Sequence, residues 1–401
     1  MIAKTTIAEV AAAQRENLRD RETGLARDAL HRLPQPNTHA LIISGIRRCG
    51  KSTLMHQLLR GDYADAFFLN FEDPRLYGFD LRDFSRLDDL LQESGQKVHF
   101  FDEIQVVEGW ELYVRQKLDE GCKLIVTGSN ASLLSQELGS RLTGRHLSTE
   151  LFPFSWQEFL RFRNQPPSDA MFQDYMHQGG FPEYLKSGND DVLHQLFDDI
   201  LIRDIAVRYG IRDVKSLQRL ALFLVSNTGR LVSANKLKSQ IGISATSTMM
   251  EYFSHLEQSW LFFFVPKFSY SVKKQNVNPR KVYAIDTGLV QVNSKSFTSD
   301  LGPLFENLVF LFLRRRYKEI AYFRKKGECD FIALEKGQPA EVMQVCLKLT
   351  ADNLERELNG LFEALRFFGL QEGHIITLNQ HDRFEQDGLT AIAVPCREYF
   401  G

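Results

Sequence analysis

Short strand-like runs separated by longer helical stretches make up the first 160 residues. Five runs have the length of a buried strand: 40–43, 66–71, 98–101, 123–127 and 146–151. Between the first two, residues 52–59 have helical periodicity, with Leu54, Met55 and Leu58 on one side. Near-continuous apolar strands joined by helices are typical of parallel sheets covered on both faces. The pattern therefore predicts an α/β fold.

The pattern changes beyond residue 160. Residues 160–230 are mostly helical, and 232–258 read as a helix, a glycine turn and a second helix. Two strand-like segments follow at 261–265 and 281–284, an order typical of a winged helix-turn-helix. We therefore predict four parts: a helical lead-in (1–37), a phosphate-binding core (38–158), a helical and winged-helix domain (159–290) and a C-terminal α/β domain (295–401).

Composition narrows the class of protein. The 401 residues are 43% hydrophobic, enough for two or three domains, and the net charge of -2 excludes a general polycation. The five cysteines include no C-x-x-C pair, which favours a reducing compartment. The longest apolar runs are about a third of a membrane span. We expect a soluble cytoplasmic protein with no membrane association.

Gly45–Ser52 matches the pattern G-x-x-x-x-G-K-[ST] at every fixed position, between a predicted strand and a predicted helix. Backbone N–H groups of such a loop bind phosphate, assisted by the helix N-terminus. Lys51 is expected to reach the β- and γ-phosphates, and the Ser52 hydroxyl to ligate Mg²⁺. The expected nucleotide-binding residues are Gly45, Ile46, Arg47, Arg48, Cys49, Gly50, Lys51, Ser52 and Thr53.

Asp102 and Glu103 end the apolar run 98–101 and supply the second half of this site. Asp102 is expected to hold Mg²⁺, and Glu103 to polarise the attacking water. Asn130, beyond the run 123–127, could contact the γ-phosphate or that water. These residues predict ATP and Mg²⁺ as the bound species.

Arg141 and Arg145 are candidate arginine fingers, which neutralise charge in the transition state across a subunit boundary. A finger from a neighbour requires a homo-oligomer. The alternative for both is a salt bridge or an exposed position.

Several segments together resemble the bacterial and archaeal AAA+-type P-loop ATPases that carry a C-terminal PD-(D/E)XK nuclease-like domain of unknown function. The matching segments are 44–52, 70–74, 101–105, 127–130, 142–145, 152–159 and 179–183. The resemblance covers nearly the whole chain. It implies ATP hydrolysis, with Asn130 as the sensor and Arg141 or Arg145 as the finger, and it does not supply a substrate.

The predicted winged helix leaves two interpretations open. Residues 244–258 could enter a DNA groove, yet they include Glu251 and Glu257 and no Lys or Arg, which suits phosphate contact poorly. The alternative is a lid on the ATPase core. Basic residues of the wing keep DNA under consideration: Lys267, Lys273, Lys274, Arg280 and Lys281.

The last hundred residues resemble the PD-(D/E)XK nuclease fold, in which carboxylates bind Mg²⁺ and a lysine assists hydrolysis. Glu306 and Asp330 match the family's acidic positions. Strand 340–347 allows two registers, one presenting Glu341 and Met343 and the other Gln344 and Cys346. Neither supplies the lysine, and Lys348, on the Gln344 and Cys346 face, is the candidate substitute. We therefore predict a degenerate nuclease site, retained for DNA or partner binding or for regulation.

A basic run lies between these acidic positions: Arg314, Arg315, Arg316, Lys318, Arg324, Lys325 and Lys326. The leading hypothesis is a Mg²⁺-dependent ATPase that binds or remodels DNA through this run and the winged helix. The alternatives are a nucleotide-gated switch acting on a protein partner and an ATP-regulated DNA nuclease.

Overall fold

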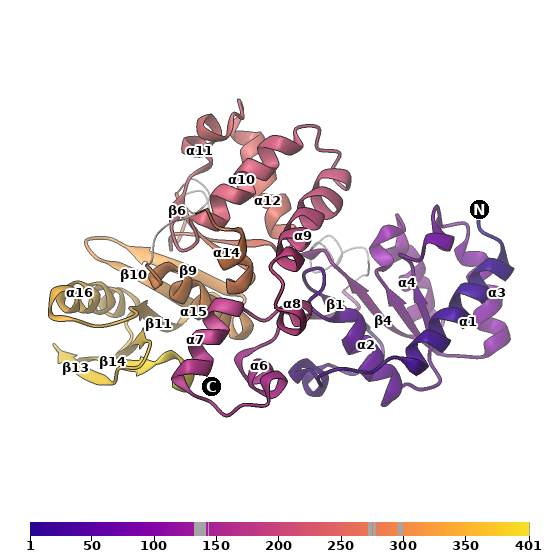
Figure 1. Ribbon diagram of the computed structural model, residues 1–401, viewed down its shortest axis with the longest axis horizontal. Helices are drawn as coiled ribbons and strands as arrows, with labels where there is room; N and C mark the ends of the chain where they lie inside the picture. Colours follow the sequence, from indigo (N-terminus) through magenta and orange to yellow (C-terminus); the bar gives the residue numbers. More distant parts are fainter. Residues whose placement is uncertain (132–141, 143, 272–274, 276–277, 296–299, 401) are drawn as a thin grey trace. The chain divides into compact units, whose positions relative to one another are not determined.

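The computed structural model describes residues 1–131, 142, 144–271, 275, 278–295 and 300–400 (Figure 1). The chain divides into two compact units. The first contains Met1–Pro153 and Gln258–Trp260, and the second contains Phe154–Glu257 and Leu261–Gly401. Each unit is described by itself below.

The first unit is built on a parallel five-stranded sheet in the order β2-β3-β4-β1-β5. Its strands are β1 (Ala40–Ser44), β2 (Phe67–Asn70), β3 (Val98–Asp102), β4 (Lys123–Gly128) and β5 (His146–Glu150). All five predicted strands are present, which confirms the α/β prediction. Because β4 separates β1 from β3, the carboxyl ends of β1 and β3 lie one strand apart.

Helices cover both faces of this sheet. They are α1 (Lys4–Asp20), α2 (Lys51–Arg60), α3 (Phe84–Ser94) and α4 (Trp110–Asp119), with 3₁₀ turns at Asp28–Arg32, Pro74–Leu76 and Ile104–Val106. Apolar residues of α1, α3 and α4 share one core with alternate sheet residues such as Ile42 and Val126. The intervening residues, including Ile43 and Ile125, are also fully buried.

The second unit begins with helices and a small sheet. The helices are α6 (Trp156–Arg163), α7 (Asp169–Gln178), α8 (Pro182–Ser187), α9 (Asp191–Asp199), a π-helical stretch Ile200–Val207, α10 (Val214–Ser226), α11 (Ala234–Ile241), α12 (Thr246–Gln258) and α14 (Thr287–Asn293). The strands are β6 (Leu231–Val232), β7 (Phe262–Val265) and β8 (Arg280–Ala284), in the order β6-β8-β7.

The predicted helix–turn–helix and both predicted wing strands are therefore present. Gly242 makes the turn after α11 with φ of +90°, a conformation that glycine adopts without strain. Strand β6 was not predicted, because two residues are too short to show a period.

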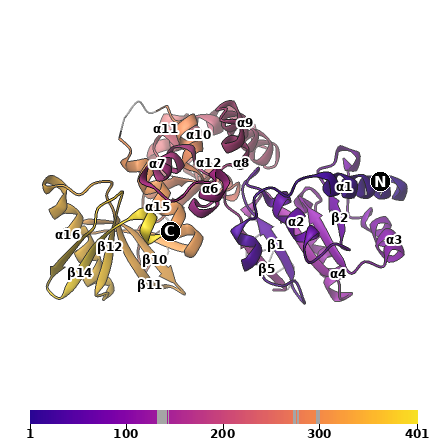
Figure 2. The ribbon, with the colours of Figure 1, turned by 60° about the horizontal axis from the view of Figure 1, so that its bottom comes forward.

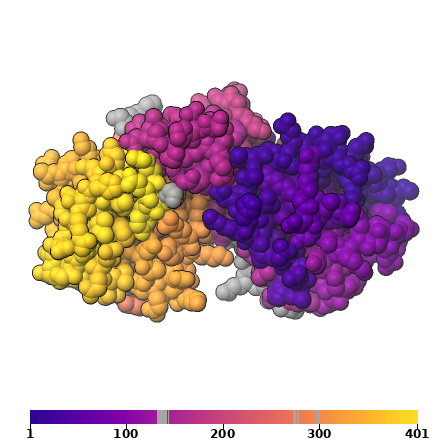
Figure 3. All heavy atoms as spheres, turned by 90° about the horizontal axis from the view of Figure 1, so that it is seen from below, coloured from indigo at the N-terminus to yellow at the C-terminus, as the bar shows by residue number. Residues whose placement is uncertain are grey.

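A mixed six-stranded sheet completes the second unit (Figure 2), in the order β13-β14-β12-β11-β10-β9. Its elements are α15 (Gly302–Arg316), β9 (Glu319–Arg324), β10 (Glu328–Glu335), β11 (Gln338–Val345), α16 (Ala351–Phe368), β12 (Glu372–Thr377), β13 (Asp382–Gln386), β14 (Leu389–Pro395) and α17 (Cys396–Tyr399). The apolar face of α16 packs on this sheet. The final strands form one continuous surface, yellow in Figure 3.

Within the described ranges, no helix has the length and apolar content needed to cross a membrane. All five cysteines are buried and free.

Candidate nucleotide-binding site

The predicted phosphate loop joins β1 to α2, as its pattern requires. At Gly45 a Cβ would lie 2.1 Å from the Leu151 carbonyl oxygen, so no side chain fits there. Gly50 precedes α2 with φ of +102°, in the left-handed region. Gly45 is thus required because a side chain would clash, and Gly50 because of its left-handed backbone conformation.

Lys51 is almost fully buried at the start of α2. Its Nζ donates to the carbonyl oxygens of Gly45 (3.1 Å) and Ile46 (3.2 Å) and lies 3.3 Å from Glu103 Oε1. Burial opposes the charged ammonium, but Glu103, Cys49 and Asp102 together outweigh burial, and the pKa of Lys51 is raised. The lysine therefore remains charged and is held against its own loop.

Asp102 ends β3 inside a network of donors. Thr127 Oγ1 donates to Asp102 Oδ1, and Asn70 Nδ2 donates to Oδ2 at 3.0 Å. Burial and the neighbouring Glu103 raise the pKa of Asp102, while hydrogen bonds from Thr127 and Ser52 lower it. The two predicted Mg²⁺ ligands, Ser52 and Asp102, therefore lie together. They line a pocket of about 320 Å³.

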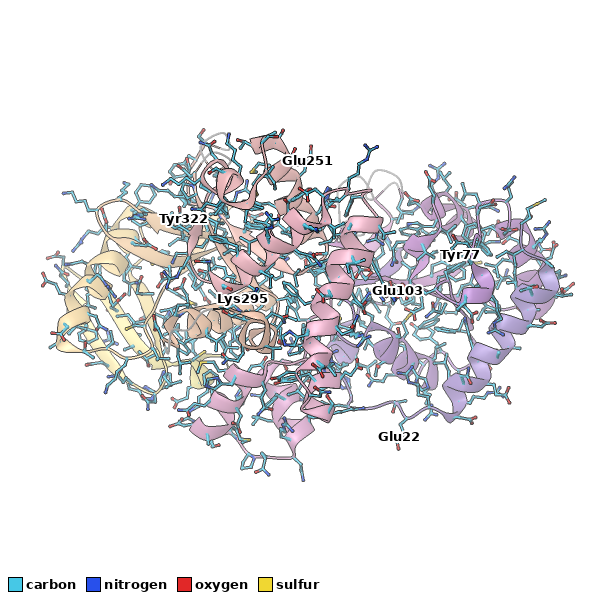
Figure 4. All side chains as sticks on the ribbon, turned by 45° about the horizontal axis from the view of Figure 1, so that its top comes forward. Glu22, Tyr77, Glu103, Glu251, Lys295 and Tyr322 are labelled. Carbon is cyan, nitrogen blue, oxygen red and sulfur yellow. The ribbon has the colours of Figure 1, made fainter. Side chains whose placement is uncertain are left out.

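Glu103 (labelled in Figure 4) adopts φ of +52°, which is uncommon for a residue with a side chain. Its Oε2 accepts from Gln105 Nε2 and from the Ser129 backbone N–H at 3.2 Å. Burial raises the pKa of Glu103. The Lys51 ammonium and the hydrogen bond from Gln105 lower this pKa, and the pKa is below its usual value overall. Glu103 is consequently an ionised carboxylate.

Gln105 and Ser129 are site residues that sequence reasoning missed. Each adjoins a residue that was singled out, and each contacts Glu103 rather than the phosphate loop. Their sequence signal was that they lie in the family-matching segments 101–105 and 127–130, close to Glu103 and Asn130.

Asn130 is buried just beyond β4. Its carbonyl oxygen accepts from Ser44 Oγ at 2.9 Å, and the Ser44 hydroxyl in turn accepts from Trp260 Nε1 at 3.2 Å. The end of β1, the Asn130 segment and Trp260 are thus linked through one hydroxyl.

Of the two candidate fingers, Arg145 is not brought to this site. Arg141 lies outside the described residues. Arg145 pairs with Asp119 at 2.6 Å, next to the start of β5. Because β5 and β1 run parallel and start side by side, Arg145 lies at the sheet edge opposite to Lys51.

The predicted C-terminal residues Glu306 and Asp330 do come together, through Lys281. Lys281 Nζ lies 3.0 Å from Glu306 Oε1 and 2.7 Å from Asp330 Oδ1. The prediction that Lys281 belongs to a DNA-contacting wing is therefore wrong, because its side chain is only 4% exposed. Its partners are at least 25 residues away in sequence, so no local pattern revealed them.

Strand β11 adopts the register that places Gln344 beside Asp330. Gln344 Oε1 accepts from the Asp330 N–H at 3.3 Å, whereas Glu341 accepts from the hydroxyls of Tyr317 and Tyr399. Cys346 Sγ lies 3.1 Å from the Lys348 carbonyl oxygen, and the Lys348 side chain is exposed. Among the described residues, no three His, Cys, Asp or Glu side chains are arranged to hold a metal ion.

The basic run does not form one exposed face. Arg314 stacks over the Phe263 ring at 5.6 Å, and Arg315 donates to the Phe154 carbonyl oxygen at 3.4 Å. Three consecutive residues of the run are exposed at the turn between β9 and β10: Arg324, Lys325 and Lys326.

The strand order and the phosphate loop define a P-loop protein of the AAA class. A family described as "AAA domain" matches residues 37–160, and a domain of unknown function (DUF8612) matches residues 169–299. An uncharacterized protein of Methanocaldococcus jannaschii is 31% identical over 89% of this chain and 85% of its own length. An uncharacterized protein of Haemophilus influenzae is 30% identical over 88% and 92%. The chain belongs to the family of AAA-domain proteins that includes these relatives.

The solved structure of Cdc6p from Pyrobaculum aerophilum aligns with 65% of this chain and 87% of its own, with 14% identity and a TM-score of 0.25. A score this low supports no inference.

Proposed function

We propose that the protein is a Mg²⁺-dependent ATPase. The observation that carries the proposal is the convergence of Lys51, Asp102 and Glu103 from separate segments onto one buried site. Ser52 and Asp102 fit a hard cation because both offer oxygen ligands and the two side chains lie within hydrogen-bonding distance of each other. When bound, Mg²⁺ would neutralise charge on the β- and γ-phosphates.

Lys51 has the central part in this proposal. Phosphate oxygens of ATP would replace Gly45 O, Ile46 O and Glu103 as partners of its ammonium, because they carry more negative charge. Glu103, released from Lys51 and still ionised, would then accept a proton from the attacking water. Asn130 would act as the sensor of the γ-phosphate.

The arginine finger would come from a neighbouring subunit, supplied by Arg141 or Arg145. The position of Arg145 at the opposite edge of the sheet is compatible with a finger only in trans. The proposal therefore includes a homo-oligomer.

We expect Lys51→Ala to abolish ATP turnover and Glu103→Gln to retain ATP binding while stopping hydrolysis, because the amide cannot accept the proton. Turnover is measured by phosphate release and binding with a fluorescent ATP analogue. Lys97→Ala, which changes an exposed lysine of the same unit, is the matched control. Hydrolysis at the wild-type rate in either site variant would contradict the assignment.

DNA is the proposed partner, through the winged helix and the exposed turn Arg324–Lys326. Three successive exposed cations suit a phosphate backbone. Two observations limit this surface: Lys281 is buried, and α12 carries the exposed, acidic side chain of Glu257.

A further inference from the structure

Lys281 forms a tripod with three carboxylates from two other elements. Its Nζ lies 2.7 Å from Asp330 Oδ1, 3.0 Å from Glu306 Oε1 and 3.2 Å from Glu328 Oε1. Lys281 comes from β8, Glu306 from α15, and the other two from β10. Two of these contacts, to Glu306 and Asp330, are hydrogen bonds donated by the ammonium, and the third, to Glu328, is an ion pair.

Further contacts fix the carboxylates around the lysine. Tyr283 donates to Glu306 Oε1 at 2.6 Å, and the Val345 N–H donates to Asp330 Oδ2 at 2.8 Å. Register shifts between Cys329 and Ile332 interrupt the pairing of β10 with β9, next to Asp330. Both Glu306 and Asp330 therefore accept a hydrogen bond from a group other than the Lys281 ammonium.

The separations are those of hydrogen bonds and not of metal coordination. Mg²⁺ requires oxygens at about 2.0–2.1 Å in octahedral geometry. A divalent cation and the ammonium cannot both occupy the space among these oxygens. Among the described residues, no group of three or more His, Cys, Asp or Glu side chains is placed to hold a metal ion, and Gln344 beside Asp330 contributes no further negative charge.

Electrostatic interactions explain why a lysine lies among these carboxylates. Burial and the neighbouring Asp330 raise the pKa of Glu306, and Lys281 opposes that rise. The pKa of Lys281 itself is raised well above its usual value, because Asp330 and its neighbours outweigh the effect of burial. Removing the ammonium would leave three close carboxylates without a shared cation.

We propose that the Lys281 ammonium takes the place of a divalent cation among Glu306, Glu328 and Asp330. The cluster is then a metal-independent connection between the winged-helix strand β8 and the C-terminal sheet, and it performs no metal-assisted hydrolysis. The inference does not rest on ATP hydrolysis. It also predicts that deleting the ammonium creates a divalent-cation site.

The test compares two replacements of Lys281, with Mn²⁺ as the probe and no nucleotide present. Lys281→Ala removes the charge and opens space, whereas Lys281→Met removes the charge and keeps the space filled. Both should lower the unfolding temperature without metal. Mn²⁺ should raise the unfolding temperature of Lys281→Ala by a few degrees, on the order of 2–4 °C, more than that of the wild type or of Lys281→Met, which share the unchanged Ser52 and Asp102 site. Adding Asp330→Asn to Lys281→Ala should abolish that gain.

A second measurement keeps the inference falsifiable if Lys281→Ala does not fold. Mn²⁺ titration of the wild type and of Asp330→Asn, followed by electron paramagnetic resonance, should give the same number of bound ions. Fewer bound ions in Asp330→Asn would overturn the inference, because the carboxylates would then hold metal in the presence of Lys281. A folded Lys281→Ala without a Mn²⁺-dependent gain would overturn it as well.

Discussion

At the scale of single residues, Asp286 and the Phe154 backbone explain the pair of glycines at 179 and 180. Asp286 Oδ2 accepts from the Gly180 N–H at 2.6 Å, and Oδ1 accepts from the Leu289 N–H at 2.9 Å. A Cβ on Gly179 would lie 2.2 Å from Asp286 Oδ1, and one on Gly180 would lie 2.3 Å from the Phe154 carbonyl oxygen. The carboxylate therefore fixes the start of α14 against the turn before α8.

Asp286→Asn should destabilise the second unit by about 1–3 kcal/mol, because the new NH₂ group would face a backbone N–H that needs an acceptor. Urea unfolding followed by circular dichroism measures the change. Asp198→Asn, at an exposed aspartate of the same unit, should stay within about 0.5 kcal/mol of the wild type. Equal stability of the two variants would show that Asp286 is not the anchor.

At the residue level, the sequence brought forward candidates whose chemistry is local in sequence. Gly45–Ser52 and Asp102–Glu103 follow from a motif and a strand end, and the structure brings them together. Lys281 was misplaced because a lysine on a half-exposed strand usually faces solvent, and only long-range packing turns it toward Asp330.

At the scale of elements, α1 is an integral part of the first unit's core. Ile7 and Val10 are fully buried against the sheet. Gln14 pairs with the edge strand β2 as a further strand would: its Oε1 accepts from the Asn70 N–H at 2.8 Å, and its Nε2 donates to Asn70 O at 3.1 Å. Asn70 in turn donates to Asp102, so α1 supports the nucleotide site.

Gln14→Ala should reduce the stability of the first unit by about 1–2 kcal/mol, because two backbone groups of Asn70 lose their partner. It should also lower ATP turnover, since Asn70 positions Asp102. Chemical denaturation and phosphate release are the two measurements. The matched control is Gln92→Ala on α3, an exposed glutamine. If both variants behave alike, the coupling of α1 to the site is absent.

Periodicity predicted the elements that bury one complete face. Four of the five parallel strands and the two helices of the winged helix were found because each is long or strongly apolar. Strand β5 is the exception, since its five residues are mostly polar and only partly buried. The association of α1 with the sheet was not found, since its two fully buried positions do not reveal what they pack against.

At the scale of the whole molecule, the DNA proposal predicts a change in affinity that depends on salt. Lys326→Glu should weaken DNA binding and reduce the slope of log affinity against log salt by about one. Lys336→Glu, at an exposed lysine of the next hairpin turn, should change neither. Fluorescence anisotropy with duplex, single-stranded and branched DNA, each with ATP, is the measurement.

The opposite outcome favours the second hypothesis. If ATP turnover and DNA affinity are insensitive to all three DNA structures, the nucleotide state acts on a protein partner instead. Nucleotide-dependent assembly, followed by light scattering, would then be the relevant signal.

The indole of Trp260 has a practical consequence. Residues 258–260 belong to the first unit, whereas the chain on either side of them belongs to the second. Trp260 Nε1 donates to the Ser44 hydroxyl at the end of β1, and the indole packs near the Phe152 ring, with the ring centres 6.2 Å apart. Because emission from an indole depends on the groups around it, Trp260 is a built-in optical probe of the phosphate loop. In a chain whose other two tryptophans are replaced by phenylalanine, its fluorescence reports nucleotide binding without any label.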